Sequence, residues 1–340
     1  MNLIELSEKF PTETEAIKHF ELIRWGKKTK CAYCGSTDVS GFDAQQRRKC
    51  YQCKKTFSVT VGTQLQHTRI PLKTWMTAFA IVSNARKGVS SIQLGKDIGI
   101  QQRTAWTMYH EIRGLMSIEN NDINPLEDIV ETDTKQVREN TRKCEELAKG
   151  KRGGIPELDE EIRKYNEKGF KFKQGKYKKP CRMVKQKTGD GASEKKIMGA
   201  VQRDGNVIAH VIKTTGFNNL RKLIDKSVKK GTTKTVLLTD EAISMQKFKG
   251  IMNSIAINHF KMYSYKGLNT NTIESFWAII ERQIVGQHHH VDLKYLEKYV
   301  AETVFKFNNR KDDDMFETLV KISMSPKKQQ IKNKKNCSTN

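Results

Sequence analysis

Two pairs of cysteines near the N-terminus have the spacing of a metal-binding site. Cys31 pairs with Cys34 and Cys50 with Cys53, and fifteen residues separate one pair from the other. A Cys-x2-Cys turn brings both sulfurs to one tetrahedral ion, and four thiolates leave no open position for a substrate. We therefore predict a structural zinc ion in a zinc ribbon. The alternatives are two unrelated cysteine pairs, or disulfides, which are rare in a chain without an export signal.

Three carboxylates on separate predicted elements have the chemistry of a catalytic metal site. Asp133 lies within a predicted strand, Asp240 ends another, and Glu274 lies one turn into a predicted helix. Carboxylates suit Mg²⁺ or Mn²⁺, and two such ions can activate an attacking hydroxyl and stabilise the leaving oxygen. Each acid taken singly is more often a surface charge than a metal ligand. Spacing alone does not distinguish these three among the 38 acidic residues.

The chain around these acids alternates strands and helices. The predicted strands cover 128–137, 196–203, 206–213, 235–240 and 254–258, and the predicted helices cover 218–229, 271–284 and 293–308. Asp204 and Gly205 suit a hairpin turn between the second and third strands. Hairpin strands followed by alternating helices and strands indicate an α/β domain with a mixed sheet.

Two helices near residue 100 have the arrangement of a helix-turn-helix. They are predicted over 90–99 and 101–113, with Gly99 in the turn. In that motif the second helix enters the major groove with its N-terminal residues, so Gln101, Gln102 and Arg103 are candidate DNA contacts. An ordinary helical hairpin would have the same pattern.

Two more helices are predicted before this motif. Thr12 and Glu15 have the spacing of a capping box at the start of an amphipathic helix. Beyond Pro71, apolar residues recur at helical spacing on one face. They are Leu72, Trp75, Met76, Phe79 and Val82.

The charge of the chain points to a polyanionic partner. The 340 residues include 62 Lys and Arg against 38 Asp and Glu, a net charge of +24. Nucleic acid is the first candidate, since no basic amphipathic membrane helix is evident. The run Arg47, Arg48 and Lys49 beside the cysteines suits phosphate contact, or a solvated surface. Without a signal peptide or a long apolar run, a cytoplasmic location is expected.

Two segments are unusually basic. Residues 138–196 hold 19 Lys or Arg against 10 acids and few large apolar residues, which favours an insertion over core structure. The C-terminal stretch 322–340 has five Lys and no acid, which favours a tail that contacts DNA nonspecifically.

Motifs along nearly the whole chain resemble those of bacterial insertion-sequence transposases with an N-terminal zinc ribbon and a DDE-type nuclease domain. Besides the four cysteines they are Phe57–Thr63, Ile70–Trp75, Thr104–Trp106, Ile112–Arg113, Val130–Asp133, Thr239–Glu241, Asn271–Trp277, Gly286–His290, Tyr299, Glu302 and Phe307–Arg310. The resemblance implies a multidomain protein. A small zinc ribbon and an all-α helix-turn-helix would precede an α/β ribonuclease H-like domain.

The resemblance also selects the catalytic residues. It implies that Asp133 and Asp240 bind the catalytic Mg²⁺ or Mn²⁺ ions. The third ligand is either Asn271 or Glu274, which lie on one helix face. We favour Glu274 because a carboxylate binds Mg²⁺ more strongly than an amide does, and Asn271 would then orient it or contact DNA.

Three residues depart from the family pattern. Thr134, Asn269 and Glu281 stand where many relatives have Glu, His and Lys. A lysine at position 281 would neutralise developing phosphate charge. The neighbouring Arg282 is the candidate substitute and a predicted DNA contact, although it points about 100° away around the helix. These departures leave a catalytically decayed copy, acting only as a DNA-binding protein, as the alternative.

The resemblance implies a DNA transposase that binds element ends, cuts them and joins them to target DNA. Its partner would be double-stranded DNA, and two ends to be joined favour a homodimer. The predicted regions are 1–66 for the N-terminal helix and ribbon, 67–120 for the helix-turn-helix, 126–320 for catalysis and 321–340 for the tail. A nuclease that cuts without joining, or a zinc-binding structural protein, are the other classes.

Overall fold

The computed structural model divides the chain into two units. It describes residues 1–138, 170–173, 182–185, 194–212, 214, 216–229, 235–240, 253–257, 269–288, 291–312 and 314–327. The first unit combines Met1–Asn124 with Ala301–Asn340, and the second is Pro125–Val300. The boundary falls within helix α11 (Leu296–Asn308). The region boundaries drawn from the sequence remain a prediction.

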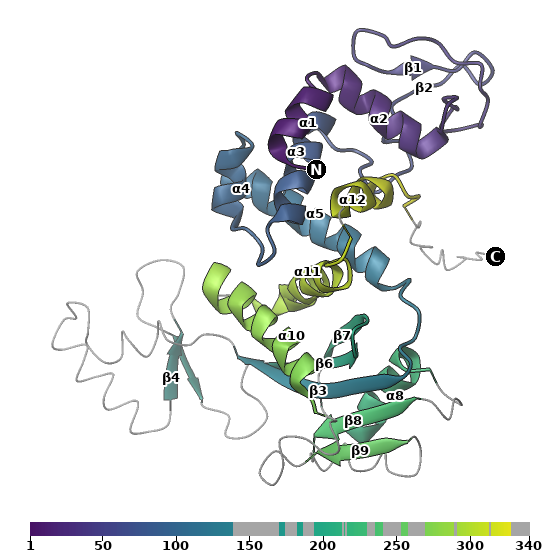
Figure 1. The fold of residues 1–340 in the computed structure, drawn as a ribbon. Helices are drawn as coiled ribbons and strands as arrows, with labels where there is room; N and C mark the ends of the chain where they lie inside the picture. Colours follow the sequence, from purple (N-terminus) through teal and green to yellow (C-terminus); the bar gives the residue numbers. More distant parts are fainter. Residues whose placement is uncertain are drawn as a thin grey trace, which may run out of the picture. The chain divides into compact units, whose positions relative to one another are not determined.

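The first unit is mainly helical (Figure 1). Besides the last part of α11, its helices are α1 (Leu3–Lys9), α2 (Glu13–Trp25), α3 (Leu72–Asn84), α4 (Ser91–Asp97), α5 (Gln102–Asn120) and α12 (Met315–Ser323). The start of α2 confirms the predicted capping box. Glu15 N donates to Thr12 Oγ1 at 3.4 Å, and Thr12 N donates to Glu15 Oε2 at 3.1 Å.

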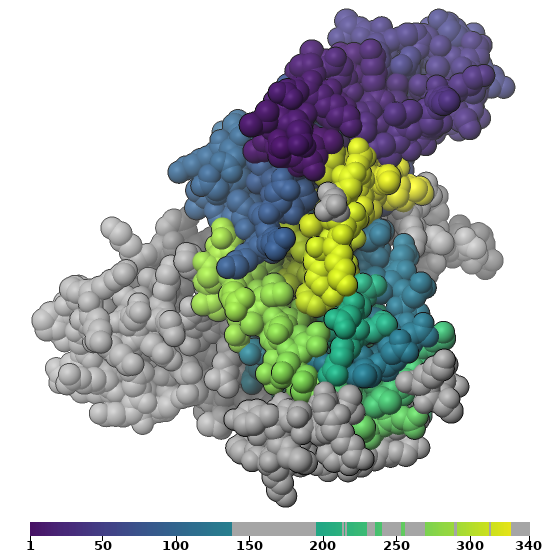
Figure 2. Space-filling model, viewed as in Figure 1, coloured from purple at the N-terminus to yellow at the C-terminus, as the bar shows by residue number. Residues whose placement is uncertain are grey.

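Apolar faces of these helices make one core. The predicted face of α3 is fully buried, and Trp75 and Phe79 pack in the same cluster as Phe20 of α2. Figure 2 shows the first sixty residues (purple) continuous with the blue residues of the same unit. The sequence did not predict α12, which adds Phe316 to this core. His19 Nε2 lies 3.0 Å from Glu317 Oε1, so α2 and α12 also share a polar contact.

The second unit contains the predicted mixed sheet. Its strands are β3 (Ile129–Arg138), β6 (Glu194–Gln202), β7 (Val207–Ile212), β8 (Val236–Asp240) and β9 (Ser254–Ile257). They lie in the order β7-β6-β3-β8-β9. The first three are antiparallel, whereas β8 and β9 run parallel to β3. The hairpin turns at Asp204, which has φ of 58°.

Helices cover both faces of this sheet (Figure 1). Residues of α8 (Phe217–Ser227) pack with Val130 and Met198 in one apolar cluster. Helix α10 (Asn271–Glu281) covers the other face, where Ile273 and Trp277 contact Gly199. It continues as a π-helical segment, Arg282–Gln287, and a 3-10 turn, Leu293–Tyr295, precedes α11. Because side chains alternate along a strand, β3 presents Val130 to α8 and Glu131, Asp133 and Lys135 to α10.

Only part of the predicted basic insertion is described. Strands β4 (Phe170–Lys173) and β5 (Arg182–Lys185) form a separate antiparallel pair. The rest of 139–193 lies outside the described residues, as do Glu241 and the tail beyond Lys327. No helix in the described parts of the chain has the length and apolar character needed to cross a membrane.

Candidate functional site

The four predicted zinc ligands lie together. One ligand atom from each of the four cysteines lies within 4.8 Å of the other three. Cys31 Sγ is 3.6 Å from Cys53 Sγ, and Cys34 Sγ is 3.6 Å from Cys50 Sγ. A zinc ion with Zn–S bonds of about 2.3 Å would require sulfurs about 3.8 Å apart at tetrahedral angles. The residues therefore fit a tetrahedral zinc site.

Local backbone geometry favours the thiolate form of Cys31, whereas burial and the neighbouring thiols raise the pKa of Cys34 to about 11. Tyr33 N donates to Cys31 Sγ at 3.4 Å, and Cys53 N lies 3.5 Å from Cys50 Sγ. Burial raises the pKa of Cys31, but hydrogen bonds from the backbone of Cys34 and Tyr33 and from the neighbouring thiols lower it to about 7. A thiolate is the form that binds zinc. Strands β1 (Arg48–Lys49) and β2 (Thr56–Phe57) pair beside the cysteines.

Arg48, one of the three basic residues predicted to contact DNA, is hydrogen-bonded within the first unit. Its Nε and Nη2 donate to the two carboxylate oxygens of Glu21 at 2.7 and 2.9 Å, and Nη1 donates to Ser40 O at 3.0 Å. The guanidinium also stacks 4.0 Å from the Phe42 ring centroid. With its donors directed inward, Arg48 ties the ribbon to α2. Arg47 and Lys49 on either side are exposed.

The two helices predicted near residue 100 are present, and two glycines set their geometry. Gly99 adopts φ of +70° between α4 and α5, a conformation that side chains disfavour. A Cβ on Gly95 would lie 2.9 Å from Ile100 O, so only glycine allows this close packing. Gln102 and Arg103 are exposed in the first turn of α5, directly after the exposed Gln101.

A buried charged cluster supports α5 from within the first unit. Glu302 of α11 accepts from Tyr109 Oη at 2.5 Å, from Arg113 Nε at 2.8 Å and from Lys306 Nζ at 2.6 Å. Burial opposes ionisation of Glu302, but Lys306 and Arg113 hold its pKa well below the ordinary range. Burial lowers the pKa of Lys306 and raises that of Tyr109. The cluster fixes the register of α11 against α5.

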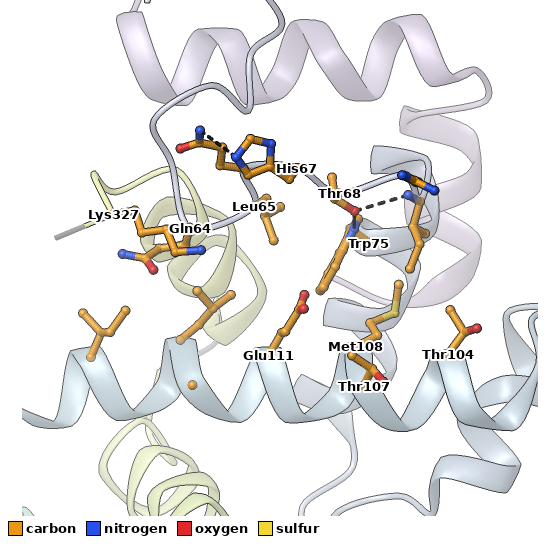
Figure 3. Close-up of a pocket in the computed structure, with 16 residues that line it drawn as sticks. Gln64, Leu65, His67, Thr68, Trp75, Thr104, Thr107, Met108, Glu111 and Lys327 are labelled. Carbon is orange, nitrogen blue, oxygen red and sulfur yellow. Dashed lines mark hydrogen bonds between the residues drawn. The ribbon is translucent and has the colours of Figure 1, made fainter. Parts of the chain in front are cut away.

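A cavity of about 590 Å³ lies between residues 64–70 and α5 (Figure 3). Leu65, Thr68 and Trp75 line it on one side, and Thr104 and Glu111 line it from α5. Trp75 Nε1 donates to Thr68 Oγ1 at 2.9 Å. None of the described residues that line this cavity is a candidate catalytic carboxylate.

The candidate catalytic residues lie along β3, β8 and α10. In the parallel register Thr132 pairs with Thr239, and Asp133 and Asp240 are the next residues on these adjacent strands. The backbone of the two strands is thus brought together at the two candidate aspartates. The side chain of Asp240 lies outside what the structure describes. Asp133 is half-buried.

Helix α10 is tied to β3 at its N-terminus by Glu131, which the sequence analysis did not single out. Glu131 is fully buried, and its Oε2 accepts from Thr272 N at 2.8 Å and Ile273 N at 3.0 Å. Arg203 Nη2 donates to Glu131 Oε1 at 3.1 Å. A carboxylate at a helix N-terminus satisfies the first N–H groups and complements the helix dipole. Glu131 therefore fixes the position of the first turn of α10, which carries Asn271 and Glu274.

Two further contacts join β3 to α10, each farther along both elements from Glu131 than the one before. Asp133 Oδ2 accepts from Trp277 Nε1 at 2.9 Å. Lys135 Nζ lies 2.5 Å from Glu281 Oε1. Four helix residues span about 6 Å and two strand residues span about 6.7 Å. Every second residue of β3 therefore meets every fourth residue of α10. Alternating charges on β3 were visible in the sequence, but their partners on α10 were not.

The remaining predicted site residues lie on the exposed side of α10. Asn271 and Glu274 are exposed, one turn apart, and Arg282 is exposed where the π-helical segment begins. Asn269 accepts from Arg203 through its backbone oxygen at 3.0 Å. Thr134 N donates to Asp133 Oδ1 at 2.6 Å. The residue at 134 therefore contacts the candidate ligand through its backbone.

Comparison with known proteins finds two family matches in this chain. Residues 11–56 match the transposase zinc-ribbon domain, and residues 167–308 match the ISXO2-like transposase domain. The second match includes Asp240, Asn271 and Glu274 and begins after Asp133. A protein in the transposable element ISH50 of Halobacterium salinarum is 27% identical over 100 residues, which cover 28% of this chain. The matched part spans only 33% of that relative.

Solved structures of a transposase show a distant similarity. The Mos1 strand transfer complex is 10% identical, with 76% of this chain and 81% of the other covered and a TM-score of 0.26. The Mos1 paired-end complex with the left transposon end is 10% identical, with coverage of 77% and 82% and a TM-score of 0.23. TM-scores this low carry no conclusion about this chain. The two family matches identify the chain as a relative of insertion-sequence transposases with a zinc ribbon and a DDE-type domain, and confirm the resemblance in its motifs.

Proposed function

We propose that this protein is a DNA transposase that binds element ends, cleaves them and transfers the strands to target DNA. The observation that carries the proposal is the adjacency of β3 and β8, where Asp133 and Asp240 each directly follow the register pair Thr132–Thr239. Counted along the chain, the strands of the sheet lie in the order 3-2-1-4-5, with the last two parallel to the first. This order supports a ribonuclease H-like domain.

The available donors suit divalent ions that prefer oxygen. Asp133 and Asp240 would hold them from neighbouring strands, and Glu274 would supply a third carboxylate from α10. When bound, the two ions would activate the attacking water or 3′-hydroxyl and stabilise the leaving oxygen. Glu131 holds the N-terminus of α10 in place for Glu274, and the exposed Asn271 would orient Glu274 or contact DNA.

Two surfaces of the first unit would bind DNA. The N-terminal turn of α5 presents Gln101, Gln102 and Arg103, as a helix-turn-helix requires of its second helix. The zinc ribbon presents Arg47 and Lys49, whereas Arg48 is engaged within the unit. The net charge of +24 favours binding to the phosphate backbone. A homodimer would bring two element ends together for joining.

A strand-transfer assay tests the proposal. Full-length protein would be mixed with a labelled fragment of the DNA that flanks its own gene, a plasmid target and Mn²⁺ or Mg²⁺, with Asp240→Asn beside it. Metal-dependent joined products from the unaltered protein alone support the transposase. Cleaved but unjoined DNA would indicate a nuclease. Binding of the fragment without cleavage by either protein would indicate the decayed, DNA-binding copy.

A further inference from the structure

The indole of Trp277 contacts a candidate metal ligand directly. Its Nε1 donates to Asp133 Oδ2 at 2.9 Å. The residue is only 4% exposed, so its position is determined by the packing of α10 against the sheet. Buried indole N–H groups usually find an acceptor, but here the acceptor is the carboxylate proposed to bind a catalytic ion.

The sheet is shaped to admit this ring. Gly199 of β6 pairs with Asp133 of β3, so it lies directly beside the carboxylate on the same face. A Cβ at Gly199 would lie 2.8 Å from Trp277 Cη2, 3.1 Å from Trp277 Cζ2 and 3.0 Å from Ile273 Cδ1. No side chain fits between the strand and the indole. The missing Cβ lets the ring lie against the backbone, where its N–H reaches Asp133.

A second donor restrains the same carboxylate. Thr134 N donates to Asp133 Oδ1 at 2.6 Å, so both oxygens of Asp133 accept hydrogen bonds. Two donors on opposite oxygens fix the plane of a carboxylate. A carboxylate has about four acceptor sites, and these two donors use two of them. Neighbours that orient a metal ligand in this way typically change metal affinity 10–100-fold when removed.

We propose that Trp277 is a positioning residue that orients Asp133 for metal binding, and that Gly199 provides the space this requires. The inference rests on the proposed function, in which Asp133 binds a catalytic ion. The competing explanation is that Trp277 only fills the core between α10 and the sheet. In that case the volume of the ring would be needed for packing, and its N–H would not affect metal binding.

The test separates the ring from the N–H. Trp277→Phe keeps an aromatic side chain in the core and removes the donor. Trp75→Phe is the matched control, because Trp75 is also buried and loses an Nε1 hydrogen bond of 2.9 Å to Thr68, far along the chain in the first unit. Mn²⁺ binding to the zinc-loaded, full-length proteins would be measured by titration calorimetry. Strand transfer would be measured in parallel as a function of Mn²⁺ concentration.

We expect Trp277→Phe to weaken Mn²⁺ binding by roughly 10–100-fold, with strand transfer partly recovered at high Mn²⁺, while Trp75→Phe binds as the unaltered protein does. Equal Mn²⁺ affinity in all three proteins would overturn the inference. If Trp277→Phe does not fold, the benzothiophene analogue of tryptophan at position 277 keeps the shape of the indole without its N–H. Normal Mn²⁺ binding by that protein would equally overturn the inference.

Asp133→Asn distinguishes the inference from the proposed function. If Asp133→Asn binds Mn²⁺ as tightly as the unaltered protein, Asp133 is not a metal ligand and the proposed function fails. If Asp133→Asn loses Mn²⁺ binding and Trp277→Phe does not, the metal site stands and only the role of Trp277 is wrong.

Discussion

Lys135 on β3 and Glu281 at the end of α10 form an ion pair, with Nζ and Oε1 2.5 Å apart. Lys135 follows Asp133 by two residues and therefore lies on the same face of the strand. The resemblance to the transposase family suggested that a cation was lost at position 281. The ion pair places an ammonium group from β3 beside that position instead.

Lys135→Gln is expected to slow strand transfer by about tenfold or more, because a positive charge beside the proposed metal site would stabilise developing phosphate charge. Glu281→Gln should leave the rate within about threefold, since it keeps Lys135. Rates would be measured at saturating Mn²⁺. The matched control is Lys229→Gln, which removes a 2.9 Å pair with Glu127 on the same unit. Equal rates for Lys135→Gln and Lys229→Gln would exclude a role of Lys135 in the reaction.

Glu131→Gln is expected to lower the stability of the second unit by about 2–3 kcal/mol. The buried carboxylate bonds with two backbone N–H groups of α10 and with Arg203, and a neutral amide weakens all of these interactions. Urea unfolding followed by circular dichroism would measure the change. Glu127→Gln removes an exposed carboxylate nearby in sequence and should cost less than about 1 kcal/mol. A similar loss in both variants would argue against the anchoring role.

Glu302 should make the first unit sensitive to acid. Burial opposes its ionisation, but Lys306 and Arg113 lower its pKa below the ordinary 4.5 in the folded protein. A lowered folded pKa means that the stabilisation is complete above about pH 4.5 and is lost progressively as the pH falls below that value. Thermal unfolding from pH 7 to pH 3 should therefore show a fall in Tm that begins near pH 4.5.

Glu302→Gln should reduce that acid dependence and cost about 3–5 kcal/mol at pH 7, because Arg113 and Lys306 lose their buried counter-charge. The double variant Glu302→Gln, Lys306→Met has the net charge of the unaltered cluster and should recover part of the loss. If the double variant were no more stable than the single one, the charge balance of the cluster would not explain its contribution.

Zinc removal should unfold the ribbon and leave the sheet intact. Cys50 is fully buried, and with the other three cysteines it has the geometry of a closed structural site. Cys50→Ser should lower the zinc content below one ion per chain and abolish specific binding to element ends in a mobility-shift assay. Cys144→Ser, outside the four, is the control. Unchanged zinc content in Cys50→Ser would contradict the assignment.

Local patterns determined much of the fold in advance. The capping box of Thr12 and Glu15, the turn at Gly99 and the hairpin at Asp204 each depend on residues a few positions apart, and the structure contains all three. The spacing of the four cysteines was likewise enough to predict their cluster. In contrast, the sequence did not predict α12, whose apolar residues pack against α2, α3 and α5.

The partners of the site residues were decided by tertiary structure alone. Trp277 and Asp133 are 144 residues apart, and Tyr109 and Glu302 are 193 residues apart. The hydrogen bond from Arg48 to Glu21 likewise depends on the packing of α2 against the zinc ribbon, which the basic run of residues 47–49 does not indicate. Sequence patterns indicate which face of an element is apolar, because apolar residues repeat with the period of the element. They do not indicate which distant element covers that face, because the covering element depends on how the whole chain packs.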